Sequence, residues 1–118
     1  LLVKVPGCDV NQAMRDGRTP AFIAAQVGHT AALEALVRAG CDVNRADDFG
    51  ATPAYIAAQL GQTAALEVLV KAGCDFNLAA KNGETPAFIA AHEGHTAALE
   101  VLVKAGCDVN QAMNDGAT

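Results

Sequence analysis

The amino-acid sequence predicts an all-α solenoid, in which stacked helix-turn-helix repeats carry short β-hairpin turns. Two sets of residues return every 33 positions along the 118-residue chain. Gly-Cys-Asp begins at Gly7, Gly40, Gly73 and Gly106, and Gly-x-Thr begins at Gly17, Gly50, Gly83 and Gly116. A fixed period of this length indicates repeats that bury their apolar faces only against their neighbours. The side chains are 52% hydrophobic but only 4% aromatic, so small residues predominate and helices can approach closely.

Each repeat is expected to contain two helices, and the middle one shows why. Thr52 suits an N-cap, Pro53 suits the first helical position, and Gly61 can take the left-handed conformation that ends a helix. A second, longer helix is expected from Thr63 to Gly73, with the same kind of start and stop. Oppositely charged residues stand four apart on this helix in every unit, in the favourable order, and indicate a solvated outer face. They are Glu34 with Arg38, Glu67 with Lys71 and Glu100 with Lys104.

A turn is expected between one helix pair and the next, because Asp-Gly and Asn-Gly favour hairpin turns. In the middle of the chain this signal is Asn82-Gly83. The period then divides the chain into one array: a partial unit at 1–13, complete repeats at 14–46, 47–79 and 80–112, and the start of another at 113–118.

The four cysteines recur once per unit, which argues against a disulfide framework or a zinc site. Equivalent residues in stacked units lie roughly 10 Å apart, whereas a disulfide needs Cα atoms within about 7 Å. Zinc needs ligands that converge on one point. We therefore expect small buried thiols, no metal and no cofactor, in a reducing cytoplasmic or otherwise intracellular setting.

Three strings make the chain similar to the ankyrin repeat family. Gly-x-Thr-Pro occurs at Gly17–Pro20, Gly50–Pro53 and Gly83–Pro86, and Ala-Ala-x-x-Gly-His occurs at Ala24–His29 and Ala90–His95. Gly-Cys-Asp-Val-Asn stands where the family has Gly-Ala-Asp-Val-Asn. The resemblance covers nearly the whole chain. It implies antiparallel helix pairs in a slightly curved array with hairpin fingers along one edge, and a role in protein recognition without chemistry.

The chain departs from the family pattern at several positions. Phe22, Tyr55 and Phe88 stand in the place of the family's first histidine, and Gln62 replaces the second histidine in the middle unit. Aromatic packing is expected to replace the lost polar links. No distinct capping unit is visible at either end, which favours a fragment of a longer array. A designed repeat scaffold is the alternative.

Charge and residue types exclude several classes of function. The net charge of −5 argues against a nucleic-acid surface, and no apolar stretch reaches the roughly 18 residues that span a membrane. The chain has no Ser, and its cysteines lack a neighbouring base. His92-Glu93-Gly94-His95 does not have the zinc-protease spacing. We expect neither an enzyme nor a small-molecule substrate.

Positions that vary between units are the candidates for binding an unknown protein partner. They lie in the turns and near the ends of the first helices, on the side that the family resemblance assigns to recognition. They are Arg15, Asp16, Arg18, Asp48, Phe49, Ala51, Lys81, Asn82 and Glu84 in the turns, and Gln26, Val27, Gln59, Leu60, His92 and Glu93 on the helices. Phe49 and Leu60 are the apolar candidates for an anchor. The alternatives are solvent-tolerated variation and a structural spacer or engineered scaffold that binds nothing specific.

Overall fold

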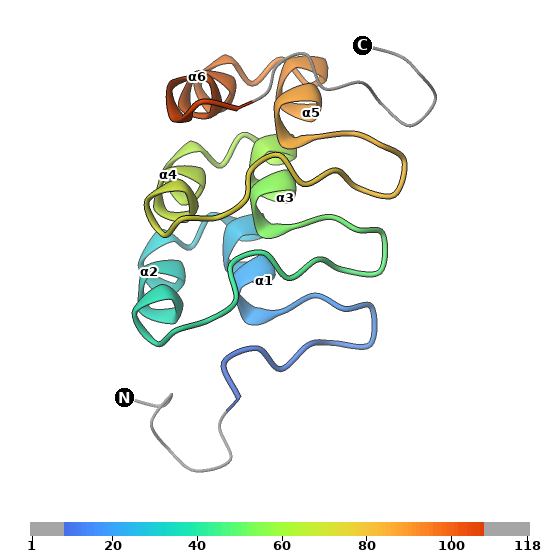
Figure 1. The fold of residues 1–118 in the computed structure, drawn as a ribbon. Helices are drawn as coiled ribbons and strands as arrows, with labels where there is room; N and C mark the ends of the chain where they lie inside the picture. The colour runs from blue at the N-terminus through green and yellow to red at the C-terminus, as the bar shows by residue number, and fades with distance from the viewer. Residues whose placement is uncertain (1–8, 108–118) are drawn as a thin grey trace.

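The structure, a computed structural model, describes residues 9–107 as three helix pairs stacked one above the other (Figure 1). The six helices are α1 (Pro20–Val27), α2 (Thr30–Arg38), α3 (Pro53–Leu60), α4 (Thr63–Lys71), α5 (Pro86–His92) and α6 (Thr96–Ala105). The first helices form one column and the second helices form another, while the hairpins project beyond the first column (Figure 1). The all-α helix-turn-helix solenoid is therefore confirmed. The predicted partial units at the two ends lie wholly or largely outside the described residues.

The threonine before each first helix begins it as predicted. The Oγ1 atoms of Thr19, Thr52 and Thr85 accept hydrogen bonds from the backbone N–H three residues later, at 3.2, 3.1 and 3.1 Å. All three side chains are buried, so the bond satisfies a hydroxyl and a helix N–H that water cannot reach. Gly61 ends α3 in the left-handed conformation, with φ of 70°.

The second helices begin differently from the prediction. Thr63 is the first helical residue of α4, and the N-cap is Gln62, whose side chain makes no capping bond. The Thr63 hydroxyl instead lies 3.4 Å from the carbonyl oxygen of Gly61, to which it donates. Only two residues separate α3 from α4, so the chain turns too tightly for Thr63 to cap its own helix.

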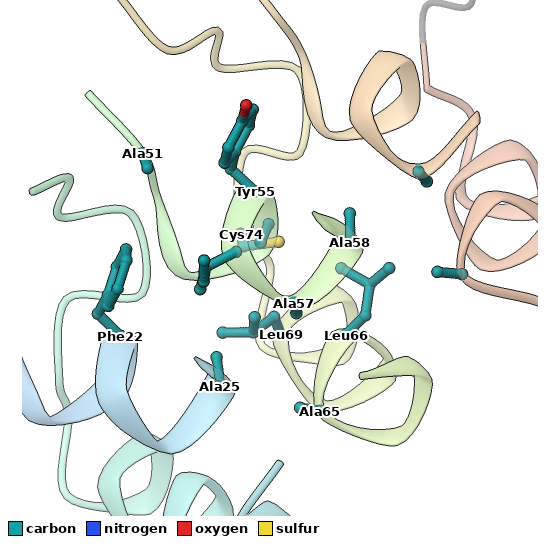
Figure 2. Close-up of a cluster of buried hydrophobic side chains, with 14 of the residues drawn as sticks. Phe22, Ala25, Ala51, Tyr55, Ala57, Ala58, Ala65, Leu66, Leu69 and Cys74 are labelled. Carbon is teal, nitrogen blue, oxygen red and sulfur yellow. The ribbon is translucent and has the colours of Figure 1, made fainter. Parts of the chain in front are cut away.

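Small side chains fill the interface between the repeats (Figure 2). Ala25 and Ala58 on the first helices have no exposed surface, and neither do Leu66 and Leu69 on α4. α1 contacts α3, α3 contacts α5, and the second helices contact one another in the same order. The methyl side chains of the first helices let neighbouring repeats approach closely, and the buried leucines add larger apolar side chains to the core.

Asparagine side chains link successive repeats beside the second helices. Asn11 Oδ1 accepts the backbone N–H of Asp42 at 2.8 Å, and Asn44 Oδ1 accepts that of Asp75 at 2.7 Å. Each bond spans 31 residues of sequence, so it exists only when neighbouring repeats are stacked in register. The recurring Asn is thus a structural residue of the array.

The described cysteines differ in burial. Cys74 is 6% exposed and lies within the apolar cluster (Figure 2), whereas Cys41 and Cys107 are partly buried against it. Cys41 and Cys74 are free thiols. Burial, with a smaller effect of Asp75, raises the pKa of Cys74 to about 11, so its thiol is protonated at neutral pH. Within residues 9–107 no helix has the length and apolar character to cross a membrane.

Candidate functional site

Three hairpin turns of the same design project from the array, at residues 14–18, 47–51 and 80–84. In the second, the Asp47 N–H donates to the Ala51 carbonyl and the Gly50 N–H donates to the Asp47 carbonyl, both at 2.9 Å. The glycine has φ of 78°. This is a three-residue loop that ends in a left-handed residue. The bond from Asp47 to Ala51 joins the two arms of the hairpin, and no regular strand forms within the described part of the chain.

Backbone hydrogen bonds join the hairpins into a continuous edge. The Asp48 N–H donates to the Asp16 carbonyl at 2.9 Å, and the Lys81 N–H donates to the Phe49 carbonyl at 3.0 Å. A Cβ atom at Gly50 would lie 2.9 Å from the Lys81 nitrogen, so both the backbone conformation and the close approach require glycine here. The tips are therefore held at fixed spacing rather than projecting independently.

A hollow of about 540 Å³ lies between these tips and the first helices. Phe22, Tyr55 and Ile56 form its apolar floor, and Phe49 stands at its edge with 75% of its surface exposed. An aromatic side chain that is this exposed contributes little to the stability of the array. We call the surface made by the three hairpins and the first helices α1, α3 and α5 the hairpin face.

Polar side chains around the hollow are held by specific contacts. Arg18 Nε lies 2.7 Å from Asp16 Oδ2, and Arg18 Nη1 donates to Gln26 Oε1 at 3.3 Å. The Tyr55 hydroxyl donates to Glu84 Oε1 of the next hairpin at 2.6 Å. Burial and this carboxylate raise the pKa of Tyr55 above its ordinary value, so the phenol is neutral at physiological pH. These contacts fix the positions of the polar groups around the hollow.

The structure brings about half of the predicted binding positions together. Those that line the hollow are Asp16, Arg18, Gln26, Phe49, Ala51, Gln59, Lys81 and Asn82. Arg15 and Asp48 are exposed on the hairpins, and Glu84 is partly buried and accepts the hydrogen bond from Tyr55. The remaining predicted positions, all near the far ends of the first helices, are Val27, Leu60, His92 and Glu93, and all four are exposed.

Two of the predicted binding positions, Ala51 and Leu60, add no exposed side chain to the hollow. Ala51 is only 6% exposed, because it lies where the hairpin returns to the helix, and its methyl group belongs to the floor. Leu60 is 46% exposed but does not line the hollow with Phe49. Leu60 ends α3 whereas the hairpin leads into its beginning, and eight helical residues span about 12 Å. The two apolar side chains therefore do not form one anchor.

Sequence reasoning missed two links that shape this face. The first is the Tyr55–Glu84 bond, and the second is the Gln62 side-chain amide, which donates to the Gln26 carbonyl of the preceding repeat at 3.0 Å. In the sequence, Tyr55 and Gln62 were noted only because they replace histidines of the family pattern. A signal was present in principle, since each stands about one period from its partner.

The hollow is lined by apolar and amide side chains, by the ion pair of Arg18 and Asp16, and by Asp47 and Lys81. Among residues 9–107 no three His, Cys, Asp or Glu side chains come together in a way that could hold a metal ion.

Comparison with known families and proteins adds one positive finding. A family model for ankyrin repeats, in three copies, matches residues 1–80 and 61–118, which together span the whole chain. No curated protein matches the chain.

Proposed function

Because the chain belongs to the ankyrin repeat family, whose members are generally protein-interaction modules, we propose that it binds a protein partner through its hairpin face. The family is typically non-catalytic, and we propose the same for this chain. The partner's segment lies across the hollow between the hairpin tips and the first helices. No small molecule or nucleic acid takes part.

The observation that carries this proposal is the position of Phe49. Its ring is 75% exposed at the rim of a hollow with an apolar floor. A large apolar side chain beside ordered polar groups has the composition of an interface centre with its rim. Truncation of such a residue typically reduces affinity strongly while leaving the fold intact.

The proposed contact surface is smaller than the set of positions that the sequence predicted. Its core is Phe49 with Gln59 and Lys81, and Arg18 and Asn82 border it. Ala51 belongs to the floor and is left out. Exposed residues at the far ends of the first helices, such as Leu60, contribute only if the partner extends beyond the hollow.

The proposal has two further parts. The complete repeats run over residues 14–46, 47–79 and 80–112, and the protein works in a reducing, intracellular location. The boundaries are supported by hairpins that begin at residues 14, 47 and 80. The location is supported by the free thiols of Cys41 and Cys74. Locating the tagged full-length protein in cells tests this part.

Capture of partners with the 118-residue chain, followed by affinity measurement with single variants, tests the proposal. Phe49→Ala is expected to weaken binding of the captured partner at least about tenfold, a loss of about 1.4 kcal/mol. Glu67→Ala on α4 is the matched control, because Glu67 is exposed on the second-helix column, and should leave affinity unchanged.

Two outcomes would overturn the proposal. If Phe49→Ala and Glu67→Ala bound every captured partner as tightly as the parent chain, the hairpin face would not be the binding surface. If no stoichiometric partner were recovered in repeated captures, the chain would act as a structural spacer or as a scaffold without a specific ligand.

A further inference from the structure

The outer side of the second helices carries two rows of opposite charge. Each of these helices has an acidic residue followed four positions later by a basic one, and α2, α4 and α6 contact one another in that order along one column (Figure 1). All six side chains are exposed. The acidic row is Glu34, Glu67 and Glu100, and the basic row is Arg38, Lys71 and Lys104. We call the surface that they form the charged face.

The two rows do not pair with each other inside the chain. Four residues of helix span only about 6 Å, yet none of the six side chains takes part in an ion pair or a side-chain hydrogen bond within residues 9–107. Both rows can therefore pair with groups outside the chain. Their charges cancel, so the charged face is neutral, whereas the whole chain has a net charge of −5.

Partly buried valines lie between the charged side chains. A groove of about 420 Å³ lies along α2 and α4, and one of about 460 Å³ lies along α4 and α6. Glu67 and Lys71 line both grooves, with Val68 in the first and Val101 in the second. A partner that paired with the charged rows would also cover these apolar groups, which favours association.

We propose that the charged faces of two copies of this chain pack against each other about a two-fold axis that runs along the stack. This axis turns the acidic row of one copy onto the basic row of the other and keeps each repeat beside its equivalent. Glu67 of each copy then pairs with Lys71 of the other, and the flanking repeats make the equivalent pairs. The contact uses the same surface of both copies, as symmetric dimers do.

The spacing of the rows is the reason that the partner is a second copy. Neighbouring packed helices lie about 8–10 Å apart, so a partner that satisfies both rows must carry three charges of each sign at this interval. A second copy meets this condition because its rows have the same period. A two-fold axis across the stack does not, since it would place each row against itself and oppose like charges.

The dimer is expected to be weak and reversible. Exposed ion pairs each contribute little, but six of them form together and the valines add apolar contact. The charged face lies on the column farther from the hairpins (Figure 1), so both hairpin faces stay open in the dimer. Self-association and binding of a protein partner are therefore separate properties with separate tests.

Sedimentation velocity of the 118-residue chain, from about 10 to about 500 µM, measures this association directly. The weight-average mass should rise from the chain mass of 12.0 kDa toward twice that value and not beyond it. Glu67→Lys makes two attractive contacts repulsive, because the substitution occurs twice in the dimer, and should weaken association at least about tenfold. Asp48→Lys is the control with the same change of charge, since Asp48 is exposed on a hairpin, and it should associate as the parent chain does.

A mixture of two variants tests which charges pair. Lys71→Glu alone should also weaken association, but an equimolar mixture with Glu67→Lys should dimerise about as tightly as the parent chain, because every reversed charge then faces one of opposite sign. The control mixture is Glu67→Lys with Lys104→Glu, which has the same net charges. Its reversed charges lie in different repeats, so association should stay as weak as in either variant alone.

Circular dichroism checks that each variant keeps its helices. A parent chain that stays monomeric throughout this range would overturn the proposal, and so would a Glu67→Lys variant that associates as the parent does. A mixture of Glu67→Lys and Lys71→Glu that associates no better than its components would exclude the two-fold pairing. Equal recovery in the control mixture would also overturn it, because the charges would then act without regard to the repeat that carries them.

Discussion

Substitution of Gly50 by alanine tests how tightly the hairpins are joined. Gly50 has φ of 78°, and a Cβ atom there would lie 2.9 Å from the backbone nitrogen of Lys81. The left-handed conformation alone costs alanine about 1–2 kcal/mol. The close contact also forces the next hairpin away and weakens the 3.0 Å bond from Lys81 N–H to the Phe49 carbonyl, which contributes about 1 kcal/mol. The total expected loss is about 2–3 kcal/mol.

Gly73→Ala is the matched control for the conformational part of this cost. Gly73 has φ of 84°, but nothing lies within 4 Å of the place its Cβ would take. Its substitution should cost only the strain of about 1–2 kcal/mol. The free energy of unfolding from urea titrations measures both variants, and Gly50→Ala should be less stable than Gly73→Ala by about 1 kcal/mol. Equal losses would refute the claim that adjacent hairpins are in backbone contact.

Three further predictions concern single links in the array. Tyr55→Phe removes the hydroxyl that donates to Glu84 at 2.6 Å and should lower the free energy of unfolding by about 1 kcal/mol; an unchanged value in urea titrations would mean that this bond is not formed in solution. Asn44→Ala removes the acceptor of the Asp75 N–H at 2.7 Å and should cost about 1 kcal/mol, with faster amide exchange at Asp75 as the specific readout and unchanged exchange as the contrary result. Burial raises the pKa of Cys74 from 9.0 to about 11, so the unfolded state loses its thiol proton first and stability should fall as pH rises from 9 to 11; Cys74→Ala should show a smaller fall over this range, and an equal fall would exclude the thiol as a cause.

Much of the fold could be predicted because its signals are local. Thr52, Pro53 and Gly61 specify the start and stop of a helix within ten residues of sequence, and the structure confirms each of them. The period then places copies of this unit in a stack, since each copy has only its neighbours to pack against. Local rules failed at Thr63, where a tight connection between two helices decides which residue caps the second one.

The candidate site was harder to predict because it depends on distances between repeats. Ala51 varies between units and therefore looked like a surface position, yet the path of the hairpin buries it. Phe49 and Leu60 are both exposed and apolar, but the length of α3 keeps them from sharing one hollow. The Tyr55–Glu84 bond joins residues 29 apart. No rule that reads one unit at a time can find such a pair.

Hydrogen exchange of the 118-residue chain, alone and with its captured partner, tests the central claim most directly. Binding at the hairpin face should slow exchange at the tips, at residues 48–50 and 81–82, and at the beginning of α3. Exchange in α4 and α6, which form the column farther from the hairpins (Figure 1), should not change. Protection that falls on α4 and α6 and leaves the hairpins unaffected would contradict the account.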